Sequence, residues 1–239
     1  MAAKQWYEGV VREVIFETPK IRRYKIEIPR LHHFDYEPGQ FIHLELPLGE
    51  KRNFRAYSIA SSYKEKNLLE LIISYNGKGK GTGYIFEHFV PGFPVRISSA
   101  LGKFVLPKKI EKEICFICTG VGISPFRSMY NYIIQNNIEH KGIKLIFGTR
   151  ESEDICYYYE LNSLDNANEL FEYLPVLSRD DSGWQGKKGY VHDIYRELYS
   201  DGRDTDFYIC GWKDMVMEAR KNLNDMGYDK ENIHIESYG

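Results

Sequence analysis

The sequence predicts a two-domain protein: an antiparallel β-barrel domain followed by an α/β domain with a doubly wound parallel sheet. Two observations lead to this prediction. The first half of the chain has short apolar strands separated by turn residues, and the second half alternates strands with helix-like stretches. A chain of 239 residues is long enough for two cores. We expect the barrel at 1–108 and the α/β domain at 109–239.

Six segments of the first half have the length and the apolar or alternating pattern of strands. Turn signals such as Pro38-Gly39, Asn76-Gly77 and Pro91-Gly92 separate them. Closely spaced strands without long helices between them are typical of an antiparallel barrel. The expected strands are 10–18, 22–29, 39–47, 55–62, 68–75 and 94–100. Residues 81–89 are expected to form a short helix with Thr82 as its N-cap.

The second half follows a linker at 107–113 and has the β-α rhythm of a parallel sheet. Its expected strands are 113–120, 144–150, 172–179, 206–211 and 232–239. Its expected helices are 124–135, 154–164, 191–199 and 213–227.

Composition places the chain among ordinary globular proteins, with 43% hydrophobic and 28% charged residues. No apolar run approaches the length of a membrane helix, and the first residues have no secretory core, so we expect a cytoplasmic protein.

The net charge of −2 is unevenly spread: residues 1–108 have 17 Lys and Arg against 11 Asp and Glu, and the rest have 15 against 23. This asymmetry fits either surface scatter or a basic face that docks an acidic protein.

The four cysteines do not predict a metal site. Cys115 and Cys118 form a C-x-x-C, but they lie in an apolar run that reads as a strand. Residues three apart on a strand point to opposite faces, so their thiols cannot converge on one metal ion. No second C-x-x-C exists to complete an iron–sulfur or zinc site. We expect buried strand cysteines and no cluster.

One motif on the barrel side is Arg55-Ala56-Tyr57-Ser58. On a strand, Arg55 and Tyr57 share a face and Ser58 takes the other. A guanidinium can bind a diphosphate, a tyrosine ring can stack on a flat ligand, and a hydroxyl can hydrogen-bond a ring nitrogen. Taken alone, the four residues could equally form an ordinary exposed strand.

Two glycine motifs precede predicted helices. Gly77 to Gly83 contains Gly81 and Thr82, where free helix amides would favour phosphate, although a flexible turn has the same composition. Thr119-Gly120-Val121-Gly122-Ile123-Ser124-Pro125 joins a strand to a helix, which is the context of a dinucleotide phosphate turn. Pro125 stands where such turns often have a third glycine, and proline is tolerated in a first helical turn.

Two further features lie near the C-terminus. Cys210-Gly211 ends a predicted strand, at the sheet edge where ligands bind in α/β folds. Glu236-Ser237-Tyr238-Gly239 ends the given sequence, and polar residues in such a place are usually a tail.

The order of these motifs resembles the ferredoxin–NADP(+) reductase family. The series is R-x-Y-S, a glycine-rich turn with threonine, G-x-G-x-x-P, C-G and a final E-x-Y, and the likeness extends from about residue 8 to the end. In the plant-type members the tyrosine is the last residue, whereas here Gly239 follows Tyr238.

The resemblance implies two cofactors, FAD and NADP(H), with NAD(H) as the alternative. Arg55, Ala56, Tyr57, Ser58, Gly81 and Thr82 would bind FAD, with Tyr57 stacked on the isoalloxazine and Ser58 hydrogen-bonded to N5. Thr119, Gly120, Gly122, Pro125, Cys210 and Gly211 would bind the nicotinamide dinucleotide. The implied catalytic residues are Ser58, Cys210 near nicotinamide C4, Glu236, which orients the nicotinamide, and Tyr238, which covers the flavin.

The choice of nicotinamide depends on cations that could bind a 2′-phosphate. Arg150, Ser178, Arg179, Lys187, Lys188 and Tyr190 resemble the NADP-binding side of the family. The W-x-G-x-x-G-x-V pattern from Trp184 to Val191 is also similar to NADH-dependent relatives such as cytochrome b5 reductase. We favour NADPH.

The resemblance implies an enzyme that exchanges a hydride at flavin N5 and passes single electrons between NADP(H) and ferredoxin or flavodoxin. The carrier would dock on the basic N-terminal half. The alternatives are an NADH-dependent reductase component of an oxygenase or cytochrome system, and a non-catalytic flavin relay subunit.

Overall fold

The computed structural model describes residues 5–49, 53–62, 66–179 and 183–238, so Gly239 lies outside the described residues. The chain divides into two compact units, which are treated separately below. The first contains Met1–Leu106 and Ser124–Asn137, and the second contains Pro107–Ile123 and Ile138–Gly239.

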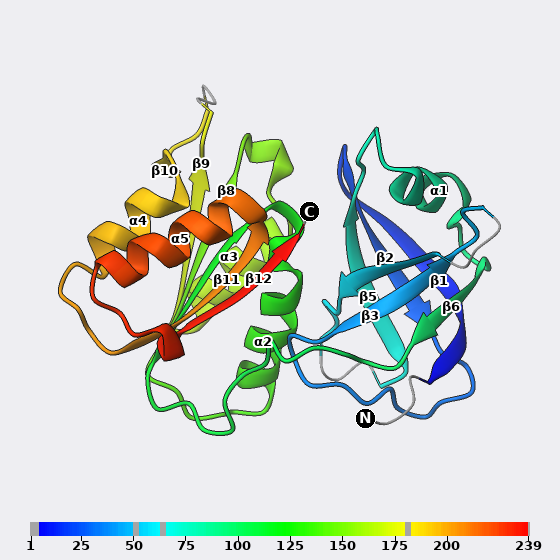
Figure 1. Cartoon of the computed structure of the whole chain (residues 1–239), viewed down its shortest axis with the longest axis horizontal. Helices are drawn as coiled ribbons and strands as arrows, with labels where there is room; N and C mark the ends of the chain where they lie inside the picture. The colour runs from blue at the N-terminus through cyan, green and yellow to red at the C-terminus, as the bar shows by residue number, and fades with distance from the viewer. Residues whose placement is uncertain (1–4, 50–52, 63–65, 180–182, 239) are drawn as a thin grey trace. The chain divides into compact units, whose positions relative to one another are not determined.

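The first unit is a six-stranded antiparallel sheet with the order β4-β3-β6-β1-β2-β5 (Figure 1). Just after β4, the backbone N–H of Ala60 donates to Glu70 O on β5 at 2.9 Å, which brings the two edge strands together and closes the barrel. The strands are β1 (Trp6–Thr18), β2 (Ile21–Glu27), β3 (Phe41–Leu46), β4 (Asn53–Ser58), β5 (Leu68–Ser74) and β6 (Pro94–Ser98). The predicted barrel is confirmed.

The core of this unit follows from the alternation of its strands. On β3, Ile42, Leu44 and Leu46 point inward and are fully buried, while the residues between them are half-exposed. Leu69, Leu71 and Ile73 of β5 join the same core, as do residues of β1, β2 and the helix α1 (Lys80–His88).

The predicted short helix is present, but its predicted N-cap is wrong. The N-cap of α1 is Gly79, and Thr82 is the third helical residue. Thr82 does not cap the helix because its Oγ1 accepts a hydrogen bond from the backbone N–H of Asn76 at 3.1 Å and lies 3.2 Å from Asn76 O, in the preceding turn. Gly79 can occupy the N-cap position without a side chain.

Helix α2 (Ile123–Gln135) follows a short 3₁₀ turn, Gly120–Gly122, and from Ser124 onward it belongs to the first unit. Phe126, Met129, Tyr130 and Ile133 are fully buried, at the i, i+3, i+4, i+7 spacing of one helix face. A Cβ built on Gly39, whose φ is +100°, would lie 2.1 Å from the backbone oxygen of Phe104, so the barrel turn requires glycine there.

The second unit is a six-stranded sheet of parallel pairs with the order β10-β9-β8-β7-β11-β12 (Figure 1). From β7 the chain proceeds outward through β8, β9 and β10, then returns to the other side of β7 with β11 and β12. This reversal is the topological switch point of a doubly wound sheet. The strands are β7 (Glu113–Thr119), β8 (Ile143–Thr149), β9 (Phe171–Leu177), β10 (Lys187–Lys188), β11 (Thr205–Trp212) and β12 (Ile233–Tyr238).

Helices connect these strands as predicted, with one difference. Helices α4 (Val191–Leu198) and α5 (Lys213–Asp225) pack on the sheet, α4 on β8 and α5 on β11 and β12. The helix expected from residue 154 instead begins later, as α3 (Tyr158–Ala167). Ser152–Asp154 form a 3₁₀ turn, and the left-handed backbone of Tyr157, with φ +57°, prevents a continuous helix.

Cys115 and Cys118 lie on β7 as buried free thiols, as predicted. Within the described ranges there is no cluster of side chains able to hold a metal ion. In the same ranges, no helix combines the length and the apolarity needed to cross a membrane.

Candidate functional site

The first site residue, Arg55, lies on β4 next to the N-terminus of α1. A Cβ built on Gly81 would lie 3.4 Å from Arg55 Nε and 3.4 Å from Leu46 Cδ1, so a side chain there would fill the space beside the guanidinium. The first amides of α1, from Lys80 to Thr82, have no acceptor within the helix. A guanidinium and free helix amides converge here, and both favour an anion. This arrangement fits the diphosphate of FAD.

The Thr82 side chain bonds the turn that precedes α1. Its hydroxyl already bonds the turn at Asn76 and lies 3.3 Å from Gly79 O. The hydroxyl therefore holds the turn against the helix, and the backbone N–H is the group of Thr82 that can reach a phosphate.

Tyr57 and Ser58 follow Arg55 on the same strand. Tyr57 pairs in register with Ile42 and packs against the barrel core. Burial raises its pKa to about 12, although the charge of Arg55 opposes the shift, so the phenol stays neutral. Ser58 is 5% exposed, whereas Ala56 is exposed. The strand thus has the guanidinium and the aromatic ring on one face, and Ser58 is buried at its end.

The second unit brings the dinucleotide turn against the end of β11. A Cβ built on Gly122 would lie 2.4 Å from Cys210 O and 2.9 Å from Gly211 Cα. A Cβ on Gly211, whose φ is +147°, would lie 2.4 Å from Thr119 Oγ1. Both glycines are therefore required for the two backbones to pack together. Because β7 and β11 flank the switch point, the turn lies where α/β folds bind ligands.

Two details of this turn fit a dinucleotide. The Thr119 Oγ1 atom is buried and has no hydrogen-bond partner among the described residues. Gly120 has φ +53° and open space around its Cβ position, so the backbone can approach a ligand. Pro125 is buried in the first turn of α2, as the sequence predicted.

Strand β12 brings the C-terminal residues beside Cys210. In the parallel register Glu236 lies opposite Cys210, and Tyr238 lies opposite Trp212. The C-terminal segment is therefore a strand of the sheet and not a loose tail. Burial raises the pKa of the Cys210 thiol well above its usual value, and the Glu236 carboxylate raises it further. Cys210 is thus a neutral thiol, suited to packing against a ring rather than to nucleophilic attack.

The predicted 2′-phosphate residues meet at the ends of β8, β9 and β10. Ser178 N donates to Thr149 O and Arg179 N donates to Arg150 O, both at 3.0 Å. Lys188 pairs in register with Leu177, immediately before Ser178. Arg150, Ser178, Arg179, Lys188 and Tyr190 are all exposed.

Arg179 is not a free cation, because its Nη1 lies 3.2 Å from Glu151 Oε1. Both side chains are partly exposed, so water screens this ion pair. Glu151 places a negative charge among the cations expected to bind the 2′-phosphate. The sequence motifs did not point to this residue.

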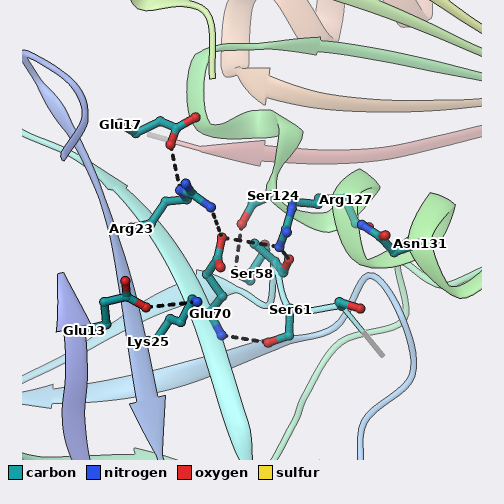
Figure 2. Close-up of polar contacts among 12 residues, drawn as sticks. Glu13, Glu17, Arg23, Lys25, Ser58, Ser61, Glu70, Ser124, Arg127 and Asn131 are labelled. Carbon is teal, nitrogen blue, oxygen red and sulfur yellow. Dashed lines mark hydrogen bonds and ion pairs between the residues drawn. The ribbon is translucent and has the colours of Figure 1, made fainter. Parts of the chain in front are cut away.

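Three buried residues near Ser58 were also missed. Ser124 Oγ donates to Ser58 O at 2.9 Å, and Arg127 donates to Ala60 O and pairs with Glu70 at 3.3 Å (Figure 2). The sequence contained a signal for them: Glu70 interrupts the apolar run of β5, and Arg127 lies within the apolar face of α2.

The predicted catalytic residues are divided between the units. Ser58 belongs to the first unit, and Cys210, Glu236 and Tyr238 belong to the second. A barrel with an arrangement that fits a diphosphate, together with a doubly wound domain whose turn fits a dinucleotide, is typical of flavin-dependent, nicotinamide-linked oxidoreductases.

Comparisons with known proteins agree with this class. Residues 9–106 match the oxidoreductase FAD-binding domain, and residues 116–221 match the oxidoreductase NAD-binding domain. The chain is 30% identical over 228 residues to ferredoxin–NADP reductase B of Sorangium cellulosum, covering 92% of this chain and 93% of that protein. It belongs to the ferredoxin–NADP reductase family, and is a flavoenzyme that binds FAD and a nicotinamide dinucleotide.

One further relative is longer than this chain, and one solved structure matches the fold over almost all of both chains. The electron transfer component of anthranilate 1,2-dioxygenase from Acinetobacter baylyi is 25% identical over 226 residues, which are 95% of this chain but 64% of that protein. A ferredoxin NADP+ reductase from Neisseria gonorrhoeae, solved with FAD and NADP, has a TM-score of 0.84 at 24% identity, over 98% of both chains. The latter likeness concerns the fold.

Proposed function

We propose that this enzyme exchanges a hydride between NADP(H) and the N5 atom of FAD, and passes electrons singly to or from a ferredoxin or flavodoxin. The observation that supports the proposal best is the pair of complementary sites. The Arg55 and α1 site suits a flavin diphosphate, and the Gly122 turn packed on Cys210 suits a dinucleotide. FAD, when bound, supplies the redox chemistry, and the chain supplies orientation and electrostatics.

In this proposal each side chain has a limited task. Arg55 and the amides of α1 bind the diphosphate, Tyr57 stacks on the isoalloxazine, and Ser58 hydrogen-bonds N5. Glu236 orients the nicotinamide, with Cys210 beneath its ring and Tyr238 covering the flavin until nicotinamide arrives. The motif order of the family supports these assignments, as do the neutral Tyr57 phenol and Cys210 thiol.

The proposed electron carrier is acidic and docks on the first unit. The excess of Lys and Arg in residues 1–108 supports this, since complementary charges steer association. Association with the carrier is then salt-sensitive, because ions screen exposed charges.

The test of the proposal is steady-state reduction of ferricyanide by the purified holoenzyme, with kcat/KM measured for NADPH and for NADH. We expect a preference for NADPH, and then reduction of ferredoxin or flavodoxin at a rate that falls as salt is raised. A preference for NADH would contradict the assignment of Arg179, Lys188 and Tyr190 to a 2′-phosphate.

The second candidate function is an NADH-dependent reductase component of an oxygenase or cytochrome system. The specific observation in its favour is the Arg179–Glu151 ion pair. A carboxylate near the adenosine ribose repels a 2′-phosphate, and it can accept a hydrogen bond from a 2′-hydroxyl group.

This competition predicts the effect of Glu151→Gln. Removing the carboxylate frees Arg179 and removes a repulsive charge, so we expect kcat/KM for NADPH to rise about 2- to 5-fold relative to NADH, a size typical of an exposed ion pair. The measurement is the ratio of the two kcat/KM values. Glu153→Gln is the matched control, because Glu153 is an exposed acid of the same turn. An unchanged ratio in Glu151→Gln would show that the ion pair lies away from the ribose.

A further inference from the structure

Helix α2 holds the backbone of residues 58–60, at the end of the Arg55–Ser58 motif, through two buried side chains. Ser124 Oγ donates to the carbonyl oxygen of Ser58 at 2.9 Å, and Arg127 Nη1 donates to the carbonyl oxygen of Ala60. Ser124 is 1% exposed and Arg127 is 8% exposed. Because the two are three residues apart, they lie on one face of the helix. Together they bond two of the three carbonyls from Ser58 to Ala60.

The Arg127 guanidinium is itself oriented by a buried carboxylate. Glu70, whose side chain is 2% exposed, lies 3.3 Å from Arg127 and 3.5 Å from Arg23. Arg23 Nε in turn lies 2.7 Å from Glu17 (Figure 2). Two arginines and two glutamates alternate along this network, so their charges balance. Loss of one partner would leave an uncompensated buried charge, which is strongly unfavourable. The four charged side chains therefore stabilise one another in this arrangement.

The backbone of Glu70 also bonds the residues that follow Ser58. Its carbonyl oxygen accepts from Ala60 N–H at 2.9 Å, and its N–H donates to Ser61 Oγ at 2.7 Å. Glu70, which orients Arg127, is therefore itself hydrogen-bonded to residues 60 and 61, next to the carbonyl that Arg127 bonds. Residues 58–61 are held on one side by β5 and on the other by α2.

A purely structural ion pair would not need this geometry. Buried ion pairs are often replaceable by apolar side chains of similar volume at little cost in stability. Here a single guanidinium nitrogen, Arg127 Nη1, donates both to Glu70 Oε1 at 3.3 Å and to the Ala60 carbonyl oxygen at 2.5 Å, so it joins the buried carboxylate to the backbone that follows Ser58. Lysine could pair with Glu70, but its ammonium group lies on a flexible stem and lacks the rigid planar head that fixes Nη1 between the two acceptors.

We propose that Arg127, assisted by Ser124 and oriented by Glu70, is a positioning residue that sets the place of Ser58 against the flavin ring. The inference rests on the proposed role of Ser58 as the hydrogen-bond partner of N5. A small displacement of that hydroxyl changes the hydrogen bond to the ring, and misplacement by about 1 Å can cost on the order of 10²-fold in rate.

The test compares Arg127→Lys, Ser124→Ala and Ser58→Ala with the wild-type holoenzyme. Arg12→Met is the matched control, since Arg12 forms an exposed ion pair with Glu27 on the same barrel. The measurements are the position of the visible absorbance bands of bound FAD, the midpoint potential of the flavin, the rate of flavin reduction by nicotinamide, and the melting temperature.

We expect Arg127→Lys to bind FAD, to shift the flavin bands and potential, and to slow reduction about 10-fold, within the range that geometric misplacement produces. Ser124→Ala should shift the flavin bands, the potential and the rate in the same direction, but by less. Because this variant loses only a hydroxyl group, it tests the inference even if Arg127→Lys does not fold. Arg12→Met should leave bands, potential and rate unchanged. Unshifted bands and an unchanged rate in both Arg127→Lys and Ser124→Ala would overturn the inference.

The double variant Ser58→Ala/Arg127→Lys separates this inference from the proposed function. If Arg127 acts through Ser58, Arg127→Lys has little further effect once the Ser58 hydroxyl is gone, because effects on one network are not additive. An equally large effect in both backgrounds would overturn the positioning role while the function stands. If Ser58→Ala alone changes neither bands nor rate, the role of Ser58 and the inference fall together, although nicotinamide oxidation persists.

Discussion

Replacing Gly122 by alanine is expected to weaken productive nicotinamide binding strongly. The new Cβ would lie 2.4 Å from Cys210 O and 2.7 Å from Cys210 C, both backbone atoms that cannot rotate away. Either the turn or the end of β11 must move, and such overpacking destabilises a fold by about 1–3 kcal/mol. Displacing the turn by about 1 Å would lower kcat/KM for either nicotinamide on the order of 10²-fold.

The measurement is the dissociation constant of oxidised nicotinamide dinucleotide, determined by titration of the holoenzyme, together with kcat/KM. Gly83→Ala is the matched control, because Gly83 lies in helix α1 with nothing within 4 Å of its Cβ position. That variant should stabilise the protein by about 0.5–1 kcal/mol and leave nicotinamide binding unchanged. Wild-type affinity in a folded Gly122→Ala would show that nicotinamide binds elsewhere.

Ser58→Ala is expected to slow hydride transfer about 10²-fold, the size found when one preorganised hydrogen-bond donor is removed from a site of developing charge. FAD should stay bound, since the proposed diphosphate site at Arg55 and the amides of α1 does not include this hydroxyl. Glu236→Ala should act on the same step, through the orientation of the nicotinamide. The measurement is the single-turnover rate of flavin reduction at saturating nicotinamide.

The control for this variant is Ser62→Ala, in the same segment, where the hydroxyl bonds Gln135. It should bind FAD and reduce it at the wild-type rate. Unchanged rates in both Ser58→Ala and Glu236→Ala would remove these residues from the mechanism.

Hydrophobic patterning predicted the fold well because the burial of each strand follows its position, on one face in the barrel and on both faces in the parallel sheet. The alternation of Ile42, Leu44 and Leu46 with half-exposed residues predicted a barrel strand, and the apolar run from Ile114 to Cys118 predicted a strand buried on both faces. Local backbone choices were harder to foresee. The left-handed Tyr157 delays α3, and no side-chain preference indicates it, because tertiary packing buries that ring.

The motif residues of the site could be named from their order, but the contacts that hold them could not. Ser124 and Arg127 bond carbonyls that are 66 and 67 residues away in the chain, and such pairings depend on the tertiary arrangement. Glu151 was missed for the same reason, since its ion pair with Arg179 joins the ends of two different strands. The misplaced N-cap shows the limit of local rules, because the Thr82 hydroxyl bonds a turn where a helix cap was expected.

The most direct test of the account is anaerobic reduction of the bound FAD by one equivalent of NADPH or NADH, followed through the visible flavin absorbance. We expect the flavin absorbance to bleach with either nicotinamide that binds, and to bleach faster with NADPH. We expect it to return when ferricyanide is added. Absorbance unchanged by both nicotinamides, in holoenzyme that a chemical reductant still bleaches, would contradict hydride exchange. The chain would then be a flavin relay that receives electrons from another protein.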